Sequence, residues 1–140
     1  MKPYARHNAR SYAIQALYEW LISGNDIEII KQHFFNDYNF KKTDATYFDV
    51  LLKGVITKHT SLDKHMLPYL DRPLKKLDPI ELCILRIAIF ELTERSDIPY
   101  RVVINEAVEL AKKFGVTGGH KYVNGVLDKV AKDLRPTEKN

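Results

Sequence analysis

The fold class is decided by one stretch of the sequence, Asp78-Pro79-Ile80-Glu81-Leu82-Cys83-Ile84-Leu85-Arg86-Ile87-Ala88-Ile89-Phe90-Glu91-Leu92-Thr93. Asp78 and Glu81 form a capping box, and Pro79 lies between them at the first helical position. Proline has no backbone N–H, but at this position the N–H would have no partner within the helix. The stretch therefore predicts a strong helix start. From Pro79 to about Thr93 the helix is apolar almost all round. This pattern is typical of a central helix that other elements enclose.

Helical periodicity continues on both sides of this stretch. Apolar residues recur at spacings of three and four along the chain, and no segment alternates with a period of two for long enough to predict a strand. The other helices are predicted over about 4–21, from 26, from 43 or 44, from 61, from 99 to 114 and from about 121. We therefore expect an all-α fold of about seven short helices, in two packed helical sub-bundles that form one domain over residues 1–140.

Polar and glycine residues mark the ends of these helices. Thr43 or Asp44 is expected to cap the third helix, Ser61 the fourth, and Gly115 to end the sixth. The connection over 36–43 is polar and carries no recognisable chemistry. Apart from the helix over 79–93, each helix has one apolar stripe. The residues expected to face inward are Ala9, Ala13, Leu17, Trp20, Leu21, Ile27, Ile30, Phe34, Phe48, Leu51, Leu52, Val55, Leu62, Met66, Leu70, Val103, Ala107, Leu110, Ala111, Phe114, Val123, Val126, Leu127, Val130 and Leu134.

Composition narrows the class of protein. Hydrophobic residues make up 45% of the chain and charged residues 29%, which indicates a folded globular protein rather than a disordered one. A single cysteine, Cys83, offers no disulfide, so a reducing cytoplasm fits. The N-terminus has no signal-peptide pattern and no apolar run is long enough to span a bilayer. We expect a cytoplasmic protein with no membrane partner.

The sequence contains no complete catalytic or metal-binding motif. Residues 115–122 begin with glycine and carry a lysine where a phosphate-binding P-loop would, but His120 replaces the second required glycine and Tyr122 replaces serine or threonine. The five histidines have no spacing that suggests metal ligands. Cys83 is expected to be a small buried apolar residue rather than a nucleophile. We predict a binding protein with no catalytic site, no metal and no cofactor.

Arg86 is unusual because its predicted helix is otherwise almost entirely apolar. A buried arginine usually pairs with a carboxylate, and Glu91 or Glu106 would be a suitable partner. Contact with a phosphate group is the alternative.

Basic residues at the start of the first helix call for an explanation. Lys2, Arg6 and Arg10 lie in a run without acidic residues that extends to Tyr18. The positive end of a helix dipole disfavours cations, at a cost of a few tenths of a kcal/mol each. A bound polyanion would offset this cost, and Arg6 and Arg10 are four residues apart on one side of the helix. The alternative is a solvated basic helix end without a partner.

A second candidate patch lies at 117–122. Gly118 and Gly119 allow close approach of a ligand to the backbone, His120 and Lys121 offer hydrogen-bond donors, and Tyr122 offers a ring for base stacking. Glycine before a helix and tyrosine on it are also common in proteins that bind nothing. The two patches would form a convincing site only if the fold joins them.

Several motifs together resemble one family, in the family's order and over nearly the whole chain. They are Lys2-Pro3-Tyr4-Ala5-Arg6-His7-Asn8-Ala9-Arg10, Ala13-Ile14-Gln15-Ala16-Leu17-Tyr18, Ile84-Leu85-Arg86-Ile87-Ala88-Ile89-Phe90-Glu91-Leu92, Asp97-Ile98-Pro99, Val103-Ile104-Asn105-Glu106-Ala107-Val108-Glu109-Leu110-Ala111-Lys112 and Tyr122-Val123-Asn124-Gly125-Val126-Leu127-Asp128. In these motifs the chain resembles the NusB family of bacterial transcription antitermination factors.

The resemblance implies an all-helical protein that pairs with ribosomal protein NusE. In that family the pair binds the boxA element of ribosomal RNA transcripts and helps the RNA polymerase antitermination complex read through terminators. By the same resemblance, the RNA-binding residues are expected to be Lys2, Arg6, Arg10, Lys121 and Tyr122. His7 is added to them as a residue of the same RNA-facing helix end. Tyr18 and Glu81 match positions of the NusE-facing surface, and both lie outside the predicted inward stripes.

The chain departs from the family at His7 and Asn8, where consecutive arginines are common. The change removes up to two fixed positive charges, although His7 supplies one when it is protonated. Electrostatic affinity for RNA should therefore fall. Two other functions remain open, an RNA-binding accessory subunit of an RNA-modifying enzyme and a pure protein adaptor for NusE.

Overall fold

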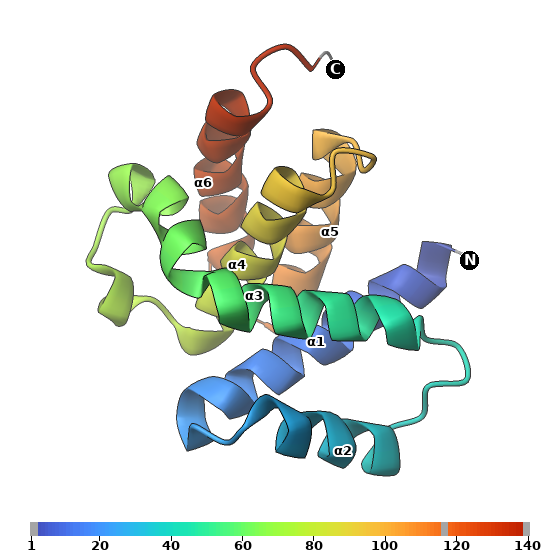
Figure 1. Cartoon of the computed structure of the whole chain (residues 1–140). Coiled ribbons are helices and arrows are strands. Elements are labelled where there is room, and N and C mark those ends of the chain that lie inside the picture. Colours follow the sequence, from blue (N-terminus) through green and yellow to red (C-terminus); the bar gives the residue numbers. More distant parts are fainter. Residues whose placement is uncertain (1–2, 116–117, 139–140) are drawn as a thin grey trace. The chain divides into compact units, whose positions relative to one another are not determined.

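Six α-helices and two short 3₁₀ helices make up the computed structural model over the residues that it describes, 3–115 and 118–138 (Figure 1). The all-α prediction is confirmed. The elements are α1 (Pro3–Ser23), α2 (Ile27–Asp37), α3 (Ala45–Met66), η1 (Leu67–Tyr69), η2 (Leu74–Lys76), α4 (Pro79–Glu94), α5 (Tyr100–Lys113) and α6 (Gly119–Leu134).

The expected count of seven helices was too high by one, because α3 runs without a break past Ser61. Serine costs little inside a helix, and Ser61 is exposed there, while the apolar stripe continues through Leu62 and Met66, which are both buried. Of the two caps proposed for the start of α3, Asp44 is the one that forms. Its Oδ1 accepts a hydrogen bond from the backbone N–H of Tyr47 at 2.9 Å.

The chain divides into two compact units, residues 1–57 and 58–140. The single domain expected from the sequence stays a prediction. In the first unit, α1 and α2 pack against each other across a tight turn. Gly24 makes this turn with a φ of +69°, and Asp26 caps α2 by accepting from the N–H of Glu28. Both residues lie where the sequence predicts a helix end and a helix start.

An aromatic cluster fills the first unit between α1, α2 and the chain that leads into α3. Phe34 stacks on Tyr38, and Phe40 meets the ring of Phe48 edge-on with centroids 5.3 Å apart. The ring of Tyr12 on α1 lies 5.1 Å from those of both Tyr38 and Phe40. The segment between α2 and α3 is therefore held by its aromatic side chains.

In the second unit, α4, α5 and α6 pack together, with α4 in contact with both of the others. Every residue of α4 from Glu81 to Leu92 is buried, so the central helix predicted from the sequence is confirmed. Asp78 caps it as expected, with its Oδ1 accepting from the N–H groups of Ile80 and Glu81. None of the described helices is long and apolar enough to cross a membrane.

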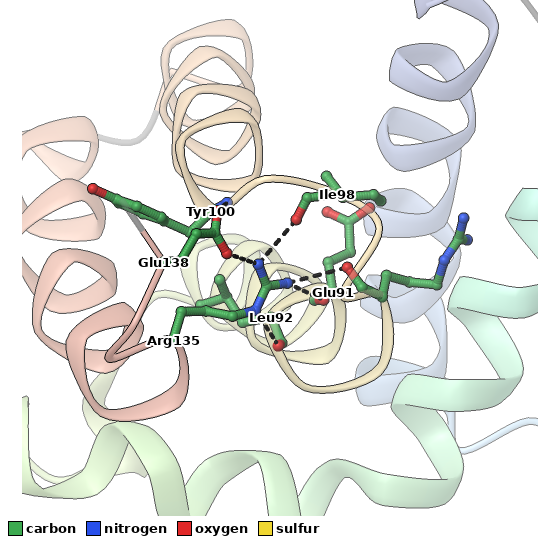
Figure 2. Close-up of polar contacts among 7 residues, drawn as sticks. Glu91, Leu92, Ile98, Tyr100, Arg135 and Glu138 are labelled. Carbon is green, nitrogen blue, oxygen red and sulfur yellow. Dashed lines mark hydrogen bonds and ion pairs between the residues drawn. The ribbon is translucent and has the colours of Figure 1, made fainter. Parts of the chain in front are cut away.

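Arg135, just after α6, closes the end of α4 (Figure 2). Its guanidinium donates hydrogen bonds to four backbone carbonyls, those of Glu91, Leu92, Arg95 and Ile98, at 3.0–3.3 Å. The last carbonyls of a helix lack partners within it, and their partial negative charge favours a cation. Arg135 therefore satisfies the C-terminal end of the most buried helix.

Glu138 completes the same cluster. Its carboxylate accepts hydrogen bonds from the guanidinium of Arg135 and from the backbone N–H of Tyr100, the latter at 2.7 Å. These contacts, the N–H of Tyr100 first, lower the pKa of Glu138 below its usual value. The cluster joins the residues after α6 to the start of α5.

Candidate nucleic-acid interface

Both predicted RNA-binding arginines lie against one aromatic ring. The guanidinium carbons of Arg6 and Arg10 are 5.1 Å and 5.7 Å from the centroid of Tyr47. Tyr47 is 3% exposed and stands in the first turn of α3, beside the Asp44 cap. Cation–π contacts of this kind hold a guanidinium in place without neutralising it. Tyr47 thus orients the basic end of α1, a role that the sequence did not reveal.

The two arginines differ in their exposure. Arg6 is half-buried, whereas Arg10 is only 4% exposed. A side chain buried to this degree offers a ligand little surface, so Arg10 fits a supporting role better than a direct contact. The direct contact with RNA expected at Arg10 remains a prediction.

The other expected residues at this end of α1 are Lys2, His7 and the substituted position Asn8. Lys2 lies outside the described residues, and His7 is half-buried. Asn8 has a defined partner, because its side-chain amide donates to the backbone carbonyl of Lys42 at 2.9 Å. Where the family often has an arginine, this chain therefore has a contact to the segment between α2 and α3.

Residues 118–122 form the second patch, at the start of α6. Gly118 is the N-terminal cap with a φ of +67°, in the left-handed region that favours glycine, and Lys121 is exposed. Val116 and Thr117 lie outside the described residues. His120 and Tyr122 are half-buried, so the donor and the ring that the sequence offered are only partly accessible.

Arg72 covers part of the Tyr122 ring. Its guanidinium carbon lies 4.7 Å from the ring centroid, and its Nε and Nη2 donate to both carboxylate oxygens of Asp71. The backbone N–H of Asp71 donates to the hydroxyl of Tyr122 at 3.1 Å. The guanidinium lowers the pKa of Asp71 to about 2, so the pair stays charged at neutral pH. An RNA base that stacks on Tyr122 must use the other face of the ring or displace Arg72.

The two residues expected to face NusE have different surroundings. Tyr18 is 40% exposed, as an interface residue should be. Glu81 is 4% exposed, so the expectation that it lies off the inward stripe was wrong. The buried part of α4 begins at Glu81 itself, after the exposed Pro79 and the half-buried Ile80. Burial raises the pKa of Glu81, while the charge of Arg72 opposes the rise.

Arg86 has a structural partner within the second unit. Its Nε and Nη2 donate to the two carboxylate oxygens of Asp63 at 2.9 Å and 2.8 Å. An ion pair was expected, but the partner is Asp63 on α3 and not Glu91 or Glu106. Sequence spacing could not indicate it, because the two residues are brought together only by packing.

Cys83 is buried, and burial raises the pKa of its thiol to about 12. Over 3–115 and 118–138, no three histidine, cysteine, aspartate or glutamate side chains are grouped so that they could hold a metal ion.

The family model described as the NusB family matches residues 7–132. This chain belongs to the NusB family. It is 50% identical to the transcription antitermination protein NusB of Photobacterium profundum, over 96% of this chain and 99% of that protein. It is 52% identical to the NusB of Citrobacter koseri, over 99% of this chain and 100% of that protein.

Solved NusB structures share the fold. The crystal structure of the antitermination factors NusB and NusE in complex with dsRNA contains a chain that matches with a TM-score of 0.84 and 26% identity, over 94% of this chain and 99% of that one. The solution structure of NusB from Aquifex aeolicus matches with a TM-score of 0.79 and 25% identity, over 97% and 93% of the two chains.

The structure reveals candidate site residues that the sequence did not indicate. Tyr47 and Arg72 each hold a predicted site residue by a cation–π contact. Lys41 and Lys42, in a segment predicted to carry no chemistry, are exposed beside the contact made by Asn8. Neighbouring lysines in a polar connection are too common to indicate a site, and only their position beside α1 makes them candidates.

Proposed function

We propose that this chain is a transcription antitermination factor. In this proposal it binds the boxA element of ribosomal RNA transcripts together with ribosomal protein NusE, within the RNA polymerase antitermination complex, and so promotes read-through of terminators. The observation that carries the proposal is family membership at 50–52% identity over nearly the full length of proteins that bear this function in their names. The protein would act in the cytoplasm, by binding and without a chemical step of its own.

The basic end of α1 is the first part of the proposed RNA site. Lys2, Arg6 and His7 would contact phosphates, with Arg10 contacting or supporting them from its buried position. Arginine suits this task because its guanidinium stays charged and forms forked hydrogen bonds to phosphate. The shared contact with Tyr47 supports this assignment, since it holds the guanidinium groups of Arg6 and Arg10 together at this end of α1.

Lys121 and Tyr122 are the second part of the proposed RNA site. The lysine would bind a phosphate and the tyrosine would stack on a base, the combination that single-stranded RNA usually requires. The exposure of Lys121 supports its part. To stack on a base, Tyr122 would use the face of its ring that Arg72 does not cover, or Arg72 would have to move.

Tyr18 and Glu81 are the proposed contacts with NusE. Exposed tyrosines are enriched at the centres of protein interfaces because they bury a large ring and still offer a hydroxyl. The 40% exposure of Tyr18 supports its part. The carboxylate of Glu81 is buried, so it would either influence the NusE-binding surface without touching NusE or become accessible when NusE binds.

A titration of labelled boxA RNA with this protein, with and without NusE, tests the proposal. The controls are a scrambled RNA of the same length and a duplex RNA. We expect boxA to bind more tightly than the scrambled strand, and NusE to strengthen that binding. A pure adaptor would leave RNA affinity unchanged when Arg6→Gln is introduced into the complex. Equal affinity for boxA and scrambled RNA, with and without NusE, would refute the proposed function.

A transcription assay separates the proposal from the accessory-subunit alternative. With purified RNA polymerase, NusE and a template that carries boxA before a terminator, this protein should increase the fraction of read-through transcripts. An accessory subunit of an RNA-modifying enzyme would have no effect in that assay.

A further inference from the structure

The segment between α2 and α3 runs along α1 in the opposite direction. Hydrogen bonds join the two at positions 5, 8 and 12 of α1. The N–H of Asp44 donates to the carbonyl of Ala5 at 3.0 Å, Asn8 donates to the carbonyl of Lys42 at 2.9 Å, and the hydroxyl of Tyr12 donates to the carbonyl of Asn39 at 2.8 Å. Positions 5, 8 and 12 share one face of a helix, so the segment is attached along about two turns of α1.

Aromatic packing fixes the same segment. The ring of Phe40 lies 4.7–5.3 Å from the rings of Tyr12, Phe35 and Phe48. The side chain of Asn39 accepts a hydrogen bond from the N–H of Lys41 at 2.8 Å. The backbone of residues 39–44 is therefore anchored before, at and after the two lysines. An anchored backbone lowers the entropy that the lysines would lose on binding a ligand.

Both lysines of this segment keep their charge available. Lys41 and Lys42 are exposed, and among the described residues neither ammonium has a carboxylate within ion-pair distance. The two nearest acidic residues in sequence are engaged elsewhere. Asp44 is buried and caps α3, and Asp37 contacts His33. Two adjacent uncompensated charges therefore stand beside the basic end of α1.

An exposed aromatic ring lies on the same face of α1. Tyr4 is 47% exposed and stands four residues before Asn8, which places the two residues on neighbouring turns. Phosphate-binding cations next to an exposed ring are the combination by which proteins bind single-stranded nucleic acid. An acidic protein partner would need the lysines but would gain less from the ring.

We propose that residues 39–43 form a second wall of the RNA site, in which Lys41 and Lys42 bind phosphates and Asn8 is a positioning residue that holds them beside α1. The inference rests on the proposed function and extends it to a segment outside the basic helix. It also gives a reason for the departure at position 8. The fixed charge missing from α1 is replaced by lysines that the asparagine side chain keeps in place.

The test is the salt dependence of boxA binding by the complex with NusE. Each phosphate contact on a single strand contributes about 0.7 to the slope of log affinity against log salt. The double variant Lys41→Gln, Lys42→Gln should therefore lower the slope by up to about 1.4 and weaken binding most at low salt. Lys53→Gln is the matched control, because Lys53 is exposed on α3 about 9 Å along the helix from Tyr47. It should change neither quantity.

Asn8→Ala separates positioning from charge. Removing the amide leaves every cation in place, so the salt slope should stay that of the native protein while affinity falls. In the lysine double variant both quantities should fall. If Asn8→Ala leaves affinity unchanged, the positioning role of Asn8 is wrong.

The outcomes distinguish this inference from the proposed function. If Arg6→Gln lowers the slope and the lysine double variant does not, the second wall is refuted and the RNA site on α1 stands. If the native protein does not prefer boxA to scrambled RNA, the proposed function itself fails. If the lysine variant weakens NusE binding and leaves the slope intact, the segment is a protein-binding surface and this inference is wrong.

Discussion

Removing Asp63 should destabilise the protein strongly, because Arg86 would be left charged and buried. The two side chains are 9% and 7% exposed, and they are joined by a forked pair of hydrogen bonds at 2.8–2.9 Å. Deleting one partner of such a pair costs about 3–5 kcal/mol, since the remaining charge loses its counter-ion without regaining water. For a chain of this length, Asp63→Ala should lower the melting temperature by about 12–20 °C.

The double variant Asp63→Leu, Arg86→Met provides the matched control. It removes both charges together and fills the space with apolar side chains of similar volume. Such replacements of buried ion pairs are often neutral or stabilising, so this variant should lie within about 1 kcal/mol of the native protein. Comparing the single and double variants by urea unfolding, followed by circular dichroism, gives the coupling energy of the pair.

The same variants decide between the two readings of Arg86. If the arginine is structural, the folded double variant should bind boxA RNA with native affinity at a temperature well below its melting point. A loss of RNA affinity in the well-folded double variant would instead assign Arg86 a phosphate contact. A destabilisation below about 1 kcal/mol in Asp63→Ala would show that Arg86 finds water or another carboxylate, and would refute the argument from burial.

Three further predictions concern the partner surface, acid stability and base stacking. Tyr18→Ala should weaken NusE binding by on the order of 1–2 kcal/mol in calorimetry and leave the melting temperature nearly unchanged, because the ring is exposed. Glu138 has a lowered pKa in the folded state, so its contribution to stability is present above pH 4.5 and is lost as the pH falls through the lowered value. Glu138→Gln should therefore reduce the difference in melting temperature between pH 7 and pH 3, and an unchanged difference would contradict the assignment. Tyr122→Leu should weaken boxA binding by about 1–3 kcal/mol without changing its salt slope, because stacking involves no phosphate. A changed slope would mean that Tyr122 acts through Arg72.

The fold was largely predictable because helical burial leaves a local signature. The apolar stretch after Pro79 predicted the central helix, and residues 81–92 are all buried in α4. Asp44 and Asp78 cap helices where the sequence placed them, since a cap depends on residues only two or three positions apart. The helix start predicted at Ser61 was wrong. A serine that could cap a helix does not begin a new one when the apolar stripe continues on both sides of it, as it does here within α3.

The candidate site was predictable only in part. The run of basic residues predicted a polyanion-binding end of α1. The family resemblance supplied the expected binding partners and the residues that would contact them. Neither source indicated that Arg10 is buried, that Glu81 is enclosed, or that Arg72 covers Tyr122. Exposure depends on what packs against a residue from elsewhere in the chain, and periodicity within one helix does not contain that information.

The sequence alone determined the helical class, the central place of α4 and membership of a family, because these follow from spacings and motifs within single segments. Tertiary structure decided which residues far apart in the chain meet. Asp63 meets Arg86, Arg135 meets the end of α4, and Lys42 meets Asn8. The physical reason is that each of these contacts pairs a polar group with a partner 23 to 44 residues away, and their meeting depends on how whole helices pack.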